Sequence, residues 1–185
     1  TFQEELDSVP PVYGISRPAN TWNPIKINFQ HLWLLIKDAW YARSFWDKIR
    51  IWFMPTGWRP ADVEARFPVA KIEDPYHFQR YAPPATRGLQ FFAYFQLIAI
   101  FLFTLYFFGN LGSIAMPGVF YYGAYIFLSI YAYSELMDRN PNAIWWELLR
   151  ATFAFGVIGV TGDWFEIDQV FYMGKYIVIA FSLVS

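Results

Sequence analysis

Few side chains in this sequence are of the types that perform acid–base, nucleophilic or metal chemistry. The chain has two histidines, His31 and His77, and no cysteine. A metal centre usually needs three or four ligands brought together with supporting contacts. Five carboxylates could assist, but they show no ligand spacing: Glu4, Glu5, Asp7, Glu73 and Asp74. No phosphate-binding glycine loop, serine-hydrolase elbow or zinc-protease motif is present. We therefore predict surface or interfacial histidines, no metal ligand and no catalytic residue.

Three charged residues stand out because they lie within otherwise apolar stretches. Glu147 and Arg150 are spaced i, i+3, so on a helix they can form a structural ion pair that lowers the cost of burying either charge. Lys175 has no partner in its own predicted span. Two interpretations of Lys175 stay open: its long stem reaches an interface, or its amine contacts Glu147, a lipid headgroup or a substrate.

The elements that would carry these charges are membrane-spanning helices. Residues 88–134 carry no charged side chain and are interrupted near Gly109–Ser113 and Pro117. About twenty apolar residues cross a hydrocarbon core of roughly 30 Å as a helix. The pattern predicts four spans, which we place at about 88–108, 114–134, 141–161 and 167–185. Asn140 and Pro141 are suited to the start of the third.

Composition supports an all-α integral membrane protein. The chain is 56% hydrophobic, 23% aromatic and only 16% charged, against roughly one quarter charged in soluble domains. We predict a polar, interfacial segment over residues 1–87 and a transmembrane domain over 88–185. The net charge of -1 provides no basic stripe, which excludes nucleic acid as an expected partner.

The distribution of basic residues predicts the topology of this multi-pass protein. Eleven of the fourteen Lys and Arg residues lie within residues 17–87, and only Arg139, Arg150 and Lys175 follow. Positive residues favour the cytoplasmic side. We expect the N-terminal segment and the 135–142 loop on that side, and the 109–113 turn and the 161–166 stretch on the other.

The polar segment contains two amphipathic patterns, which predict helices at about 27–41 and 44–54. Aromatic residues form one face and cationic residues the other, as expected of helices lying in the headgroup plane. Packing on a soluble domain would require the same pattern, but Trp together with Lys and Arg favours the interface. Five tryptophans are the candidate interfacial anchors: Trp33, Trp40, Trp46, Trp52 and Trp58.

Several segments together resemble a known family. They are TFQEE and VYGISRP near the N-terminus, TWNPIKINFQHLW, FWDKIRIWFMPTGWRP, and LMDRNPNAIWWELLR far downstream. They resemble the C-terminal part of proteins of the sterol desaturase and fatty acid hydroxylase superfamily, and within it the alkylglycerol monooxygenases. The resemblance runs from Thr1 to about Arg150.

This resemblance implies an integral membrane, di-iron, oxygen-dependent enzyme that acts on lipids, with tetrahydrobiopterin as reductant for the ether-lipid-cleaving members. In that family histidine clusters upstream of the position of Thr1 hold the metal, and no such cluster is present here. We therefore assign the chain no cofactor of its own, and two interpretations of its start stay open: a processed N-terminus, or a piece of a longer protein. Adjacency to the catalytic domain would place the loops at 13–22 and 55–58 near the substrate or reductant entrance.

Three functional hypotheses follow. The first is a C-terminal membrane module that anchors and orients the catalytic half of a lipid-oxidising enzyme. The second is a non-catalytic accessory or scaffold subunit of a larger membrane complex. The third is a small carrier that uses Glu147, Arg150 and Lys175 as polar groups. Whether the chain takes part in catalysis stays open, since no active site is visible in it.

Overall fold

The computed structural model describes residues 17–74 and 76–185, and every regular element among them is an α-helix. The chain forms two compact units. The first comprises Thr1–Asn20 and Lys26–Ala82, and the second comprises Thr21–Ile25 and Pro83–Ser185. Three of the acidic residues considered above, Glu4, Glu5 and Asp7, lie outside the described residues, as does the first part of the predicted 13–22 loop.

Three helices build the first unit: α1 (Pro24–Tyr41), α2 (Phe45–Arg50) and α3 (Ala61–Arg66). Pro24 suits the first helical position, where no hydrogen bond from its nitrogen is needed, and the Asn23 side chain accepts a bond of 3.0 Å from the backbone N–H of Ile25. The predicted helix at 44–54 is shorter in the structure, because the chain turns after Arg50.

A buried ion pair joins the helices and loops of this unit. Asp38 is the buried residue of α1, and both of its carboxylate oxygens accept bonds from Arg59, at 2.6 and 2.8 Å. Arg59 also donates to the carbonyl of Phe67 at 2.8 Å. The turn that delivers Arg59 contains Gly57 at φ +92°, a conformation that favours glycine. One bidentate pair thus fixes three segments of the chain.

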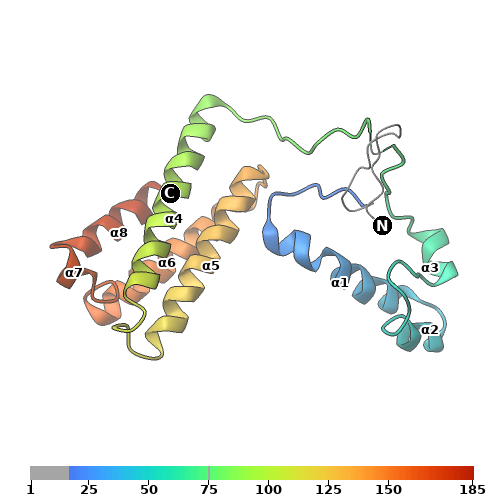
Figure 1. The fold of residues 1–185 in the computed structure, drawn as a ribbon, viewed down its shortest axis with the longest axis horizontal. Coiled ribbons are helices and arrows are strands. Elements are labelled where there is room, and N and C mark those ends of the chain that lie inside the picture. The colour runs from blue at the N-terminus through green and yellow to red at the C-terminus, as the bar shows by residue number, and fades with distance from the viewer. Residues whose placement is uncertain (1–16, 75) are drawn as a thin grey trace, which may run out of the picture. The chain divides into compact units, whose positions relative to one another are not determined.

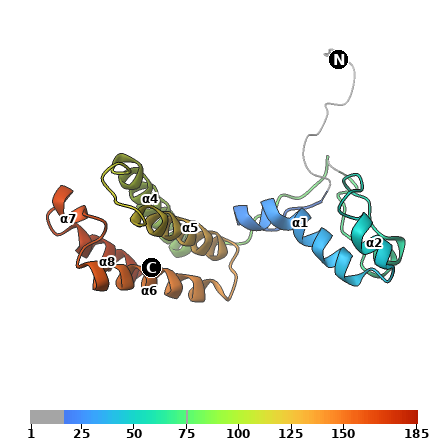
Figure 2. The same ribbon diagram turned by 90° about the horizontal axis from the view of Figure 1, so that it is seen from below.

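The second unit contains α4 (Arg87–Gly109), α5 (Gly118–Met137), α6 (Ala143–Thr161), α7 (Ile167–Val170) and α8 (Gly174–Val184). Figure 1 and Figure 2 show α5 beside both α4 and α6, and α8 beside α6. Helix α6 begins slightly later than the sequence predicts, since the Asn140 side chain first accepts a bond of 3.0 Å from the N–H of Asn142. It ends at Gly162, which has φ +77°.

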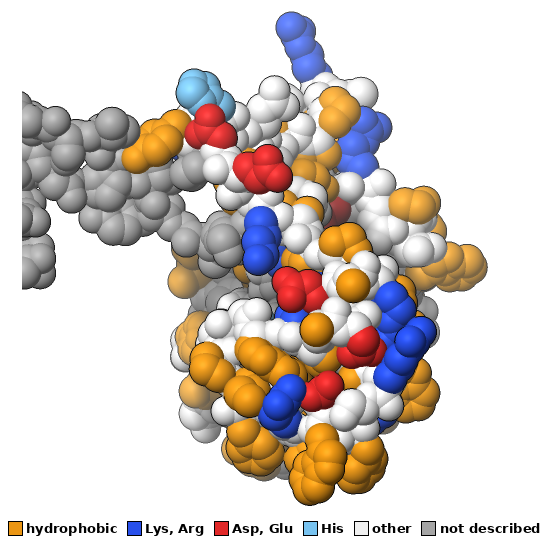
Figure 3. Space-filling view, turned by 90° about the vertical axis from the view of Figure 1, so that its right-hand side faces the viewer, with side chains coloured by type: hydrophobic (Ala, Val, Ile, Leu, Met, Phe, Trp, Pro, Cys, Tyr) orange, Lys and Arg blue, Asp and Glu red, His pale blue; other side chains and the backbone are white. Residues whose placement is uncertain are grey.

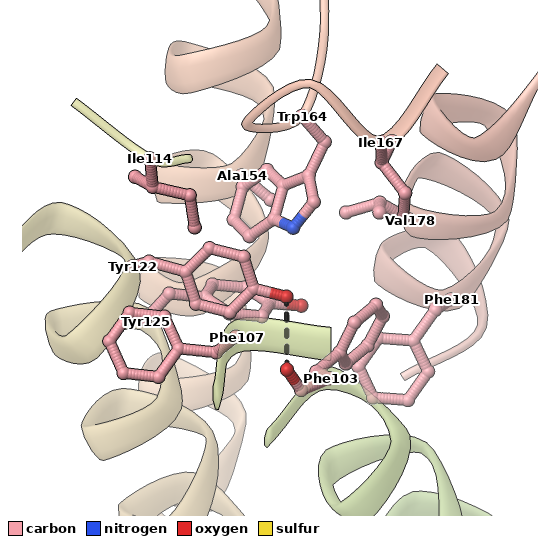
Figure 4. Packing of buried hydrophobic residues seen from close by; sticks show 10 residues of the cluster. All are labelled: Phe103, Phe107, Ile114, Tyr122, Tyr125, Ala154, Trp164, Ile167, Val178 and Phe181. Carbon is pink, nitrogen blue, oxygen red and sulfur yellow. Dashed lines mark hydrogen bonds between the residues drawn. The ribbon is translucent and has the colours of Figure 1, made fainter. Parts of the chain in front are cut away.

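Aromatic side chains fill the centre of this unit (Figure 4). Tyr122 and Tyr125 of α5 are fully buried, as is Trp164 from the loop after α6. The Tyr122 hydroxyl donates to the carbonyl of Phe103 on α4 at 3.1 Å, and the Tyr125 and Trp164 rings meet edge to face at 4.6 Å. The aromatic core therefore links α4, α5 and the α6–α7 connection at one end of the bundle.

Helices α4 and α6 have the length and hydropathy of membrane spans, with mean hydropathies of 2.0 and 1.4. Only 28% and 22% of their apolar windows are buried in the structure, so most of the apolar surface of each helix is not covered by the described residues. Helix α5 has 20 residues and is long enough to cross, but its five tyrosines, its serines and Glu135 make it less apolar than the other two.

The predicted fourth span at 167–185 is wrong as a continuous helix. The structure divides it into α7 and α8, which are separated by Phe171–Met173. Helix α8 begins only at Gly174, whereas the sequence predicts a helix that is continuous from about residue 167. The cause is local: Met173 has φ +65°, and Gly174 packs so close to Ile167 that an added Cβ would lie 2.9 Å from its side chain.

Candidate functional site: two polar clusters in the helical bundle

The first polar cluster of the bundle joins three side chains from α4 and α6. Arg150 Nη2 lies 2.6 Å from Glu147 Oε2, and Gln96 Nε2 donates to Glu147 Oε1 at 3.0 Å. Gln96 and Arg150 have no exposed surface, and Glu147 is 6% exposed. The i, i+3 spacing predicts the ion pair, and the structure contains it. The glutamine extends the pair to a second helix.

The Arg150 guanidinium also contacts α8. Its central carbon lies 4.5 Å from the centre of the Phe181 ring, a geometry in which a cation is attracted by the ring face. The buried position of Gln96 was not predicted from the sequence. Its helical spacing could have indicated it, because Ala93, Gln96, Ile100 and Phe103 form the buried face of α4.

Several buried polar atoms of the bundle have no hydrogen-bond partner among the described residues, and they include donors and an acceptor: Arg150 Nε and Nη1, Trp164 Nε1, the hydroxyls of Tyr125 and Ser182, and Gln96 Oε1. Buried donors of this kind are normally satisfied by ordered water or by an acceptor group. The Glu147–Arg150 pair is neutral as a whole, and we interpret the cluster as a structural polar network.

The Lys175 amine contacts a carboxylate and a backbone carbonyl that neither interpretation of Lys175 had named. Its amine lies 3.1 Å from Asp168 Oδ2 and 3.1 Å from the carbonyl of Gly162, so the expectation that Lys175 lacks a partner within 167–185 is wrong. Bonds from the backbone N–H and the amine of Lys175 hold the pKa of Asp168 below its ordinary value. Asp168 is seven residues away in the sequence, and only the break between α7 and α8 brings it back to Lys175.

The second polar cluster lies where residues 21–25 contact the connection between α5 and α6. The carboxylate of Asp138 accepts from the Thr21 hydroxyl and, at 2.7 Å, from the backbone N–H of Trp22. The carboxylate of Glu135 accepts from Asn23 Nδ2 at 2.7 Å and from the Asn140 side chain. We call this contact the 21–23 clasp. Asn23 and Glu135 are 0% and 1% exposed.

The clasp joins two segments that the sequence analysis singled out separately, TWNP at 21–24 and DRNP at 138–141. Arg139 directly follows Asp138 in the sequence and donates to the carbonyl of Pro84 at 2.6 Å. Three parts of the chain therefore meet at the α5–α6 connection. Sequence reasoning missed Asp138 and Glu135, because both lie at the end of a predicted span and read as ordinary flanking charges.

The candidate interfacial tryptophans divide into two groups. Trp33, Trp40, Trp46 and Trp52 are exposed, Trp40 and Trp46 by 79% and 75%. Trp58 is partly buried, with the Arg50 guanidinium 4.7 Å from its ring centre. Figure 3 shows hydrophobic side chains spread over this side of the molecule, with Lys, Arg, Asp and Glu side chains between them.

Neither histidine lies in a metal-binding group. His77 contacts Asp74 at 2.7 Å on the surface, and that bond lowers the pKa of the Asp74 carboxyl. His31 is exposed on α1. Within residues 17–74 and 76–185, no group of three or more His, Asp or Glu residues could hold a metal ion. The described residues therefore do not fit the di-iron centre that the resemblance implies.

Among curated proteins, the chain is similar to alkylglycerol monooxygenases from two organisms. The chain is 26% identical over 153 residues to alkylglycerol monooxygenase from Homo sapiens, an alignment that covers 81% of this chain and 33% of the relative. It is 23% identical over 150 residues to alkylglycerol monooxygenase from Xenopus tropicalis, with the same coverage. The chain spans about a third of the length of these relatives. No family model and no solved structure matches it. The similarity points to the alkylglycerol monooxygenase family.

Proposed function

We propose that this chain is the C-terminal membrane module of a lipid-oxidising enzyme similar to alkylglycerol monooxygenase. In this role it anchors and orients a catalytic half that holds the metal. The similarity over 81% of the chain carries the proposal, because it extends through both units rather than through one apolar helix. The same alignment covers a third of the relative, which leaves room for a catalytic half elsewhere in a longer polypeptide.

The absence of a metal-binding group among the described residues supports a division of labour. A di-iron centre, with tetrahydrobiopterin as a possible electron source, would belong to the catalytic half. This chain would contribute binding surface, membrane attachment and position. No residue of it is assigned a role in oxygen activation.

Anchoring is supported by two kinds of surface. Helices α4 and α6 present long apolar surfaces, and α5, which packs against both, would be a third crossing helix. The exposed tryptophans of α1 and α2, with Lys48 and Arg50 nearby in sequence, suit the headgroup region. We place the N-terminal segment and the α5–α6 connection on the cytoplasmic side, following the distribution of basic residues.

Orientation is supported by the 21–23 clasp. Trp22 and Asn23 are held against the α5–α6 connection by hydrogen bonds to Asp138 and Glu135. Charge-assisted bonds of this kind are short and directional. In our proposal, these bonds fix the segment through which an upstream catalytic half would be joined.

Intact mass and iron content of the native polypeptide test this proposal. Protein captured from its source membrane with an antibody to this chain should have a mass well above 21.8 kDa and should contain iron. The preparation should also oxidise an alkylglycerol when supplied with oxygen and a reduced pterin. A native mass of 21.8 kDa without iron would refute the proposal. Copurification with other membrane subunits would then support the accessory-subunit alternative.

A further inference from the structure

The first unit contains a cavity of about 800 Å³, within the range of small-molecule sites. It is lined by Arg17, by side chains of α1, by Glu64 of α3, and by the loops on either side of α3. From the sequence, the loops at 13–22 and 55–58 were expected near an entrance, and Arg17, Thr56, Gly57 and Trp58 all lie on the cavity wall. We propose that this cavity binds a zwitterionic phosphate compound, with a phosphate group beside Arg17 and an ammonium group beside the cavity's carboxylates.

The charged residues of the wall fall into two sets. Asp38 and Arg59 form two hydrogen bonds with each other, and Arg59 donates a third to the Phe67 carbonyl. This ion pair therefore has a structural role and is not available to a ligand. The set left to face a ligand contains both signs of charge and one histidine: Arg17, His31, Glu64, Lys71 and Glu73.

Arg17 provides the most specific indication of an anion. Its Nη1 atom is buried and has no hydrogen-bond partner among the described residues. Leaving a buried charged donor unsatisfied is costly, and the planar fork of a guanidinium matches two oxygens of a phosphate group. Lys71 and His31 lie on the same wall and add positive charge and a further donor.

The rest of the wall suits the other half of a zwitterion. Glu64 and Glu73 supply carboxylates that would repel a simple anion but attract an ammonium group. Leu34, Leu35 and Val69 provide apolar contact for the methylene groups that separate the two charges. A compound with a phosphate and an ammonium group separated by a short carbon linker therefore has a matching group for the cationic, the acidic and the apolar residues of the wall.

This chemistry has two possible sources, a soluble phosphozwitterion and the headgroup of a membrane lipid. Binding to the cavity does not depend on lipid oxidation, so this inference is independent of the proposed function. It can be measured on the full chain without iron, reductant or a catalytic half.

The test uses the full chain purified in a maltoside detergent, which contains no phosphate, with phosphocholine as the probe. Calorimetry or phosphorus NMR should show saturable binding of phosphocholine, with weaker binding of inorganic phosphate or choline alone. Arg17→Met should weaken phosphocholine binding at least about tenfold, the effect of losing a charged hydrogen bond. Arg80→Met is the matched control, because Arg80 is exposed and lies off the cavity wall.

A second variant tests the ammonium half. Glu73→Gln should weaken binding of phosphocholine while leaving inorganic phosphate unchanged or more tightly bound. Unaltered helical content and melting temperature in each variant exclude unfolding as the cause. Equal binding by wild type and Arg17→Met, or equal binding of inorganic phosphate and phosphocholine, would overturn the proposal. Displacement of phosphocholine by lysophosphatidylcholine at lower concentration identifies a lipid source, and its failure to compete identifies a soluble one.

Discussion

The Arg150 guanidinium has no exposed surface, and its environment differs on each side. Glu147 neutralises its charge at 2.6 Å, and the ring of Phe181 covers it at 4.5 Å. A buried charge of this kind is stable only while its partner is present. The ion pair therefore makes α6 and α8 interdependent at one residue.

At this scale we predict that Glu147→Leu destabilises the bundle by about 3–5 kcal/mol, because it leaves Arg150 buried without a counter-charge. Adding Arg150→Met should restore most of the loss, since an apolar pair of similar volume needs no neutralisation. Thermal unfolding in detergent measures both effects. Leu148→Ala, at an exposed neighbouring position, serves as the control. Equal stability of the single variant and wild type would contradict the prediction.

The 21–23 clasp gives a second prediction at the residue scale. Asp138→Ala removes the acceptor of the Trp22 backbone N–H, so hydrogen exchange of that amide should accelerate by about tenfold or more, as expected for the loss of a charge-assisted bond. Mass spectrometry of the peptide that contains Trp22 measures the rate. Asp74→Ala is a suitable control, because Asp74 bonds only within its own turn. Unchanged exchange in Asp138→Ala would show that the clasp does not hold the segment.

The helices were largely predictable, and the exceptions have physical causes. Apolar length and periodicity indicated α1, α4, α5 and α6, and the i, i+3 spacing indicated the Glu147–Arg150 pair. Contacts between distant residues were not predictable, since Gln96 and Glu147 are separated by 51 positions. The break between α7 and α8 was missed because it depends on the positive φ of Met173, which a methionine in an apolar run does not signal.

At the element scale, the arrangement of α4, α5 and α6 predicts a labelling pattern. The Tyr106 hydroxyl donates to the Phe165 carbonyl, so the turns after α4 and after α6 share one end of the bundle. With α5 and α6 as crossing helices, Ser113→Cys and Glu166→Cys should react with an impermeant maleimide from one side of the membrane. Asn142→Cys should react from the other. The wild type has no cysteine and is the blank. Labelling of all three from one side would contradict this topology.

The amphipathic helices α1 and α2 lead to a prediction about depth. A nitroxide attached at Trp46→Cys in lipid nanodiscs should collide more with oxygen, which concentrates in lipid, than with a water-soluble nickel complex. A nitroxide at Ala65→Cys, an exposed position on α3, should show the reverse. Power-saturation EPR gives both accessibilities. If Trp46 and Ala65 behave alike, these helices do not lie in the headgroup plane.

At the scale of the whole molecule, the chain combines membrane attachment with an absence of metal ligands among its described residues. We predict that the chain expressed alone stays in the membrane pellet after alkaline carbonate treatment, because α4 and α6 present lipid-facing apolar surface. It should bind far less than one iron per chain when grown with excess iron. Release by carbonate would contradict the membrane assignment. Stoichiometric iron that is lost in His31→Ala or His77→Ala would contradict the placement of the metal in another part of the enzyme.

The 21–23 clasp also sets an order of events during synthesis. Trp22 leaves the ribosome 116 residues before Asp138, which corresponds to roughly 6 to 23 s at typical elongation rates. Before the end of that interval, the carboxylates of Glu135 and Asp138 have not been synthesised. The hydrogen bonds of the clasp form only after the connection that follows α5 has been translated. Closure of the clasp thus marks the moment at which the nascent chain has completed its first helical hairpin.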